Sequence, residues 1–130
     1  PYLIEIGDHV VISEGTQFIT HDGSVWVFRD SNPDLDVFGR IFVGNNTFFG
    51  INCIILPNTT IGNNCIIGAG SVVRGNIPDN SVVLGNPAKV VLKTELMEKL
   101  VQKNKNALLT KHMRRSRKDA YIRKHFNIKH

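Results

Sequence analysis

The 130-residue sequence predicts an all-β solenoid of stacked three-sided coils, and three features of one repeat predict it. Apolar residues recur at every sixth position, glycine often follows them, and small residues recur four positions after them. We call the apolar positions anchors, and they are Ile6, Ile12, Phe18, Val43, Phe49, Ile55, Ile61, Ile67 and Val73. Glycine follows five of them, at Gly7, Gly44, Gly50, Gly62 and Gly68. The small residues are Thr16, Thr47, Cys53, Thr59, Cys65 and Ser71.

A period of six fits a short strand followed by a corner, and it fits neither a helix nor simple alternation. An amphipathic helix spaces apolar residues three and four apart, and each interior glycine would cost about 1 kcal/mol relative to alanine. A strand with one inward anchor can end at a glycine or asparagine corner, such as Asn45-Asn46 or Asn63-Asn64, where a positive φ costs little. Three units make one coil of 18 residues. We predict coils over residues 6–23, 43–60 and 61–78, a partial closing turn over 79–92, and all nine anchors in the core.

The repeat is interrupted once, because the step from Phe18 to Val43 is 25 residues, which is not a multiple of six. Continuing the count would place Asp30 and Asp36 at inward sites, and an unpaired charge is too costly in an apolar core. We therefore predict that residues 22–40 leave the coil as a protruding loop. Structured loops on rigid scaffolds often carry function, and this loop contains Trp26.

Charge divides the chain into two regions. Residues 1–92 hold four Lys/Arg and eight Asp/Glu, a net charge of −4, whereas residues 93–130 hold twelve Lys/Arg and three acids, a net charge of +9. We therefore predict a β-helical domain over 1–92 and a basic, helical C-terminal extension over 93–130. In the extension, one helix is expected to start near Thr94 and a second to pass through Tyr121 and Phe126.

Composition excludes several classes of protein. No apolar run approaches the roughly 18 residues that a membrane span needs, and no basic-then-apolar leader opens the sequence, so we expect a cytoplasmic location. Two cysteines do not make a disulfide framework. Both Cys53 and Cys65 fall at small-residue corner sites on different sides of the coil, so we expect neither a disulfide between them nor a nucleophilic role.

Three segments together resemble the hexapeptide-repeat acyltransferases. They are the repeat itself, the histidine-bearing segment Phe18-Ile19-Thr20-His21-Asp22-Gly23, and the closing run Gly85-Asn86-Pro87-Ala88-Lys89-Val90. The stretch Ile67-Gly68-Ala69-Gly70-Ser71-Val72-Val73, followed by Ile77-Pro78, resembles more narrowly the galactoside, maltose and polysaccharide-cluster O-acetyltransferases. The resemblance covers about residues 4–92. It implies a left-handed parallel β-helix, usually a homotrimer, that uses acetyl-CoA to acetylate a sugar or related acceptor.

Members of that family have coils upstream of this point that contribute acceptor-binding residues. Since Pro1 already lies inside the repeat, we expect this chain to be a piece of a longer protein or to be capped differently at its N-terminal end. The identity of the acceptor, and the choice between O- and N-acetylation, are not fixed by the residues present.

The resemblance also implies roles for individual residues. His21 stands where the family keeps its catalytic base, and Phe48 stands where a tryptophan often packs on the pantetheine arm of the cofactor. Gly50 and Ala69 match positions whose backbone approaches the cofactor, and Arg74 and Lys89 match positions that meet its phosphates. Gly75 departs from the lysine that is common in the family at that site.

Acyl transfer from a thioester needs a base, and histidine changes its charge near neutral pH. We hypothesise that His21 deprotonates the acceptor hydroxyl, which attacks the thioester directly without an acyl-enzyme, and that one of the loop aspartates could orient it. Trp26 could stack on the acceptor or plug a seam between subunits. A solvated His21, a Phe48 that fills the core or an interface, and a Lys89 that is a plain surface charge are the alternatives.

Other function classes compete with acetyl transfer. A non-catalytic trimeric β-helix scaffold would leave His21 without a role. A γ-type carbonic anhydrase needs three histidines on zinc, and the coil region holds His9 and His21, so we expect no metal site. The basic extension could pack on the acidic coil, meet anionic polysaccharide or membrane-surface intermediates, or bind nucleic acid. We expect self-association as a homotrimer, a saccharide acceptor, and neither a membrane span nor a nucleic-acid partner.

Overall fold

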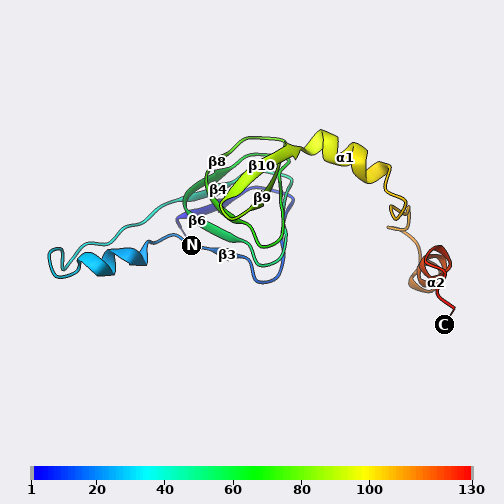
Figure 1. Ribbon diagram of the computed structural model, residues 1–130, viewed down its shortest axis with the longest axis horizontal. Helices are drawn as coiled ribbons and strands as arrows, with labels where there is room; N and C mark the ends of the chain where they lie inside the picture. The colour runs from blue at the N-terminus through cyan, green and yellow to red at the C-terminus, as the bar shows by residue number, and fades with distance from the viewer. Residues whose placement is uncertain (1, 130) are drawn as a thin grey trace. The chain divides into compact units, whose positions relative to one another are not determined.

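The computed structural model describes residues 2–129, and the chain divides into two compact units, with the boundary between Lys99 and Leu100. The first unit contains a coil of short strands with one long loop (Figure 1). Its strands are β1 (Ile4–Ile6), β2 (Val10–Ile12), β3 (Gln17–Phe18), β4 (Ile41–Val43), β5 (Thr47–Phe49), β6 (Ile54–Ile61), β7 (Ile66–Ile67), β8 (Val72–Ile77), β9 (Ser81–Gly85) and β10 (Ala88–Lys93).

The strands build three walls, because β6 and β8 each bend around a corner and contribute to two of them. The first wall contains β1, β4 and the second halves of β6 and β8, paired in parallel. The second wall contains β2, β5, β7 and β9 in parallel, closed by the antiparallel β10. The third wall contains β3 and the first halves of β6 and β8. The chain therefore forms the predicted three-sided parallel β-coil of hexapeptide repeats.

The register confirms the predicted 18-residue coil and corrects the next one. Ile41 pairs with Thr59 and Phe48 with Ile66, which are steps of 18 residues. The coil predicted over 61–78 is two residues shorter, because Ile61 pairs with Ile77, a step of 16. The two residues are missing from the corner that follows the third wall. Residues 56–58 turn that corner in one coil and Arg74 alone turns it in the next, where Gly75 adopts a φ of +84° that favours glycine.

Six anchors lie in the core as predicted: Val43, Phe49, Ile55, Ile61, Ile67 and Val73 are buried. The prediction is wrong for Ile6 and Ile12, which are 41% and 42% exposed, because no described coil stacks beyond β1 and β2 to cover them. Phe18 is partly buried and packs edge-to-face on Phe49, with ring centroids 5.5 Å apart. An anchor is therefore buried only where a further coil covers it.

The small residues that follow the anchors satisfy corner carbonyls inside the coil. Thr16 Oγ1 donates to the Gly50 carbonyl at 2.8 Å, and Ser71 Oγ donates to that of Gly68 at 2.6 Å. The Cys53 and Cys65 thiols occupy equivalent buried places and are free, and burial raises the pKa of the Cys65 thiol. These positions must be both small and polar, because each side chain points at a carbonyl of its own or the next coil.

The corner between the first and second walls is a stack of asparagines. Asn46, Asn64 and Asn80 all have positive φ, and Asn46 Nδ2 donates to Asn64 Oδ1 over 2.8 Å while Asn64 Nδ2 donates to Asn80 Oδ1 over 3.0 Å. His9 Nδ1 lies 2.8 Å from Asn46 Oδ1 at the end of this ladder. The predicted asparagine corners at 45–46 and 63–64 are confirmed.

The long loop begins as a paired stem at the corner between the third and first walls. His21 and Phe38 form an antiparallel bridge, flanked by Gly39 N to Thr20 O and Asp22 N to Val37 O, each 2.9 Å. Beyond the stem lies a 3-10 helix, η1 (Gly23–Phe28). The loop projects from the coil in Figure 1, so the chain leaves the solenoid there without breaking the stack.

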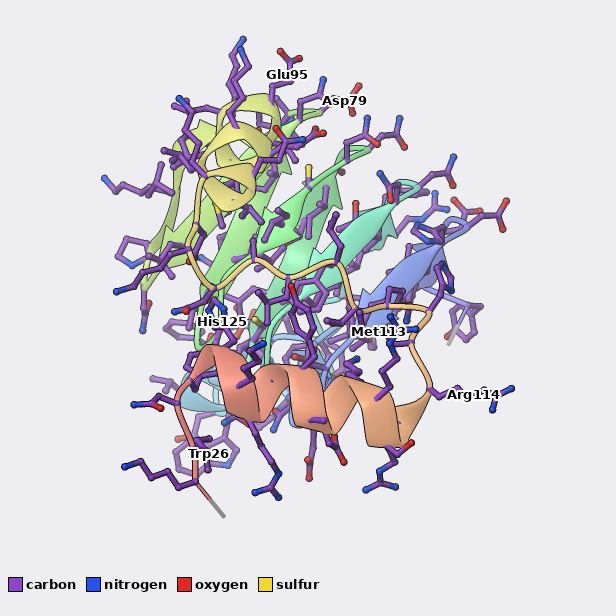
Figure 2. The ribbon with its side chains drawn as sticks, turned by 90° about the vertical axis from the view of Figure 1, so that its right-hand side faces the viewer. Trp26, Asp79, Glu95, Met113, Arg114 and His125 are labelled. Atoms are coloured by element: carbon purple, nitrogen blue, oxygen red, sulfur yellow. The ribbon has the colours of Figure 1, made fainter. Side chains whose placement is uncertain are left out.

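Two helices follow the coil. Helix α1 (Thr94–Gln102) crosses the boundary between the units, and α2 (Arg115–His125) lies in the second unit, with Arg114 and His125 marking its two ends in Figure 2. Helix α2 passes through Tyr121 as predicted, but it ends at His125, and Phe126 is its C-cap. None of the helices in residues 2–129 is both long and apolar enough to cross a membrane.

Candidate active site

His21 lies in a hollow between the loop stem and a corner of the coil. The hollow has a volume of about 390 Å³. The stem contributes Ile19, His21, Asp22, Gly23 and Val37, and the coil contributes Leu56, Pro57, Asn58 and Arg74. The bridge to Phe38 fixes the backbone of His21, while its side chain remains exposed. The stem of the loop thus presents this histidine at a defined place on a rigid scaffold.

Two smaller hollows adjoin this one and share its residues. One, of about 300 Å³, shares His21 and Asp22 and extends outward along the loop to Trp26, which is 77% exposed. The other, of about 270 Å³, shares Leu56 and Arg74 and reaches the closing run at Asn86, Pro87 and Ala88. We call the three together the His21 groove. It runs from Trp26 past His21 and Arg74 to the closing run.

Asp22 is a fixed negative charge beside His21. Its carboxylate accepts hydrogen bonds from Ser24 N at 2.9 Å and Ser24 Oγ at 2.5 Å, and so caps helix η1. The pKa of Asp22 is lowered, first by the Ser24 hydroxyl, next by the Ser24 amide, and further by the charges of Arg74 and His21. Asp22 is therefore ionised, and its recorded hydrogen bonds go to Ser24 rather than to His21.

Arg74 supplies a cation beside His21, whereas Arg29, which lines the outer hollow, is paired with Asp36. Arg74 turns the shortened corner after the third wall, lines two of the three hollows, and is exposed. Arg29 and Asp36 form a salt bridge of 3.6 Å within the loop, and no salt bridge found among residues 2–129 involves Arg74. One groove thus holds an imidazole, a carboxylate and a guanidinium that is open to a ligand.

The structure places the other predicted cofactor residues away from His21. Phe48 lies on the second wall and is 44% exposed, in a separate hollow of about 300 Å³ with His9, Val11 and Ile66. Gly50 and Ala69 stack at the corner between the second and third walls, outside the groove. Lys89 is exposed on β10 opposite Leu84 and lines none of these hollows. A single chain therefore brings Arg74 and Trp26 to His21 but not Phe48, Gly50, Ala69 or Lys89.

Sequence reasoning did not identify the coil side of the groove. Leu56, Pro57 and Asn58 line it because the corner after the third wall is wider in that coil, and Asn58 turns it with a φ of +64°. The spacing Asp22-x-Ser24 is a local signal of a helix cap that could have been recognised. His9 belongs to the asparagine ladder at a different corner from His21, so the two coil histidines do not share a site. Among residues 2–129 no group of three or more His, Cys, Asp or Glu side chains could hold a metal ion.

Comparison with known proteins repeatedly finds hexapeptide-repeat transferases and acetyltransferases. The family model described as "Bacterial transferase hexapeptide (six repeats)" matches residues 40–75. Protein CapG of Staphylococcus aureus is 50% identical over 122 residues, which cover 94% of this chain and 70% of CapG. A putative acetyltransferase of Staphylococcus aureus strain COL is 44% identical over 68 residues, which cover 52% of this chain and 34% of that protein.

Two solved structures give the same result in three dimensions. A galactoside acetyltransferase in complex with coenzyme A superposes with a TM-score of 0.66 and 33% identity, over 74% of this chain and 48% of that one. A hexapeptide-repeat acetyltransferase from Vibrio cholerae, complexed with acetyl coenzyme A, superposes with a TM-score of 0.61 and 33% identity, over 69% of this chain and 49% of that one. The chain spans about half the length of these two solved proteins.

Proposed function

The chain belongs to the bacterial hexapeptide-repeat transferase family, and on that premise we propose that it transfers the acetyl group of acetyl-CoA to a hydroxyl of a sugar or polysaccharide precursor. The relatives named as acetyltransferases, two of them solved with coenzyme A or acetyl coenzyme A, support the donor. The galactoside acetyltransferase supports a saccharide acceptor. We also infer that the coil is left-handed, as the resemblance in its repeat implies.

The observation that carries the proposal is the His21 groove. His21 takes the proton from the acceptor hydroxyl as the oxygen attacks the thioester carbonyl carbon. A C–O bond forms, the C–S bond breaks, and the proton passes from the imidazolium to the departing CoA sulfur, which leaves as the thiol. No residue is acylated, and the buried Cys53 and Cys65 do not face the groove. The carboxylate of Asp22 beside His21 favours the cationic imidazole that forms in this step.

The groove also fits an anionic donor. Arg74 carries an exposed guanidinium without a salt-bridge partner among the described residues, at the junction of two hollows, and guanidinium binds phosphate well. We assign Arg74 to the phosphates of acetyl-CoA. Lys89 is the second candidate for that role, further along the surface. Trp26, at the outer end of the groove, is proposed to stack on the saccharide ring.

The remaining site residues require a second copy of the chain. Phe48, Gly50 and Ala69 lie on the second wall or at its edge, whereas His21 lies at the corner between the third and first walls. We infer a homotrimer in which the second wall of the partner faces this groove and Phe48 packs on the pantetheine arm. The outward row of Val11, 52% exposed, and Phe48, 44% exposed, then becomes buried.

The test is release of the CoA thiol from acetyl-CoA across a panel of sugars. His21→Ala is expected to lower the rate about 10²- to 10⁴-fold, the range typical of a lost general base. His125→Ala, in the second unit, is the matched control and is expected to retain the wild-type rate. Equal rates for wild type and His21→Ala would refute the assigned base, and the absence of any acetyl-CoA-dependent reaction would favour a non-catalytic scaffold.

A further inference from the structure

The second unit presents a basic surface that the proposed acetyl transfer does not use. Residues 100–129 contain ten Lys/Arg and a single acid, Asp119. The salt bridge found in the described part of the chain is Arg29–Asp36 in the long loop, so none of these ten cations is paired with a carboxylate there. Helix α2 carries Arg115, Arg117, Lys118, Arg123 and Lys124. So high a local charge attracts an anionic surface.

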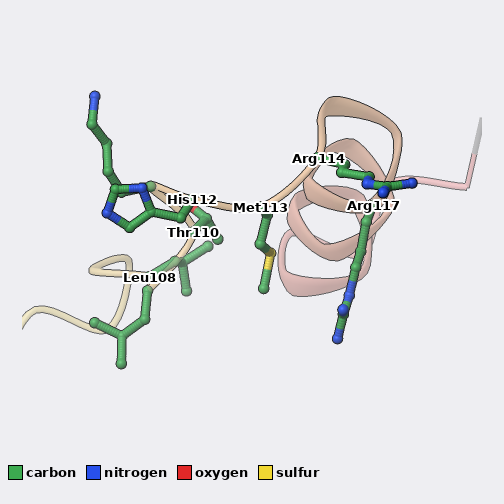
Figure 3. Close-up of a pocket in the computed structure, with 8 residues that line it drawn as sticks. Leu108, Thr110, His112, Met113, Arg114 and Arg117 are labelled. Carbon is green, nitrogen blue, oxygen red and sulfur yellow. The ribbon is translucent and has the colours of Figure 1, made fainter.

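The cations gather around a hollow that also has an apolar part. Its volume is about 620 Å³, and it lies between the segment before α2 and the first turn of that helix (Figure 3). In Figure 3, Leu108 and His112 come from the preceding segment and Arg114 and Arg117 from the start of the helix, with Met113 between them. Its lining residues are Leu108, Leu109, Thr110, Lys111, His112, Met113, Arg114 and Arg117.

The start of α2 strengthens the attraction for an anion at this place. Arg114, at the N-cap, is extended and makes no side-chain cap bond, and the first turn contains no acidic residue. The N–H groups of the first turn are therefore left without the acceptor that a serine or aspartate would supply. These N–H groups and the helix dipole favour a phosphate beside Arg114 and Arg117.

Leu109 indicates which kind of anion the hollow fits. It is 99% exposed, and so presents its whole side chain to water, and it lines the same hollow as Lys111, Arg114 and Arg117. A bilayer offers phosphates at its surface and hydrocarbon just below them, and so can receive the cations and the leucine together. Nucleic acid offers phosphates and bases that stack best on Phe, Tyr and Trp rings, and none of these three residue types lines this hollow, where His112 is the one ring.

We propose that the second unit docks on a membrane surface that contains anionic phospholipid. Lys111, Arg114 and Arg117 bind headgroup phosphates, and Leu109 enters the acyl region. Helix α2 has basic residues around most of its circumference, so it contributes charge rather than insertion. This docking is independent of the acetyl-transfer proposal, because it uses no residue of the His21 groove.

The experiment is co-sedimentation of the full chain with vesicles of phosphatidylcholine, with or without a third of phosphatidylglycerol. We expect binding to the anionic vesicles alone, falling as NaCl rises from about 50 mM to about 300 mM. Arg114→Gln combined with Arg117→Gln is expected to weaken binding about 25-fold, at roughly fivefold for each cation near the surface. Lys103→Gln combined with Lys105→Gln removes the same charge outside the hollow and is expected to weaken binding less than about fivefold.

Leu109→Ser separates docking on lipid from general attraction to polyanions. Because Leu109 is exposed, the substitution leaves the fold intact, which circular dichroism checks. It is expected to weaken vesicle binding about tenfold and to leave binding to duplex DNA unchanged. The proposal is overturned if anionic vesicles do not bind at low salt, if the two double variants weaken binding equally, or if Leu109→Ser has no effect on vesicles.

Discussion

Gly50 and Ala69 lie in successive coils so close together that a side chain on Gly50 has no room. A Cβ built on Gly50 would lie 2.6 Å from Ala69 N and 2.8 Å from Ala69 Cα. The backbones are held there by Gly50 N donating to Ile67 O at 2.8 Å and Gly70 N donating to Ile51 O at 2.9 Å. The corner between the second and third walls is thus tight because successive coils share hydrogen bonds there, whether or not a ligand binds at this corner.

Gly50→Ala is expected to destabilise the protein by about 1–3 kcal/mol, because the new methyl group meets rigid backbone. Gly23→Ala is the matched control, since nothing lies within 4 Å of a Cβ built there, and it is expected to be nearly neutral. Urea unfolding followed by circular dichroism measures both. Equal midpoints for the two variants would contradict the tight corner.

The anchors are expected to differ in their contribution to stability according to their cover. Ile55→Ala removes a fully buried side chain and is expected to cost about 2–5 kcal/mol. Ile6→Ala, at an anchor that no described coil covers, is expected to cost much less. Both free energies of unfolding come from the same denaturant titration. Similar costs would mean that Ile6 is covered in solution, for example by another copy of the chain.

Ser24→Ala is expected to raise the pKa of Asp22 back toward its usual 3.8, because the Ser24 hydroxyl is the first cause of its lowering. Arg74→Gln is expected to raise the pKa of Asp22 less, since its charge is a smaller cause. A carboxyl with a lowered pKa stabilises the fold above the unfolded-state pKa, and that contribution disappears as the pH falls through the folded-state pKa. Carbon-detected NMR titration of the Asp22 carboxyl between about pH 2 and pH 6 measures it. A larger rise in Arg74→Gln than in Ser24→Ala would contradict the assigned order.

Arg74→Gln is expected to raise the KM for acetyl-CoA about tenfold with a smaller change in kcat, because a charged contact to phosphate is lost from the bound donor. Lys89 lies outside the groove, so Lys89→Gln is expected to have a weaker effect in the same assay. Steady-state kinetics with varied acetyl-CoA give both values. An unchanged KM in Arg74→Gln would remove this residue from the donor site.

Mixing two impaired variants tests whether each site uses two copies of the chain. His21→Ala and Phe48→Ala are each expected to be impaired alone. Subunits mixed in equal amounts, unfolded and refolded together are expected to regain about a quarter of the sites, where an intact His21 faces an intact Phe48 of a partner. Activity that stays at the level of the separately refolded variants would place both residues in the site of one chain, or remove one of them from it.

The periodic part of the fold could be predicted from sequence because one anchor in six is enough to fix the walls. The prediction that every anchor is buried failed at Ile6 and Ile12, since burial there depends on a neighbouring coil and not on the residue itself. The anchor count also failed to predict that the third coil is two residues shorter, because the loss of two residues at Arg74-Gly75 leaves no apolar signal of its own.

The candidate site was predictable only in part. The break in the repeat located the loop and His21, whose role stays a prediction. The contribution of Leu56, Pro57 and Asn58 came from the width of a corner, which the anchor count does not register. The separation of Phe48 from His21 follows from the walls that the two residues occupy, and a resemblance read position by position does not contain that information.

One corner of the coil absorbs all of the irregular length described above. The corner between the third and first walls contains residues 19–40 in one coil, residues 56–58 in the next, and Arg74 alone in the last. The strands on either side keep their partners throughout. Segments of other lengths could therefore be grafted at this edge to change the ligand that the groove accepts, while the stacked interior that holds the protein together is left as it is.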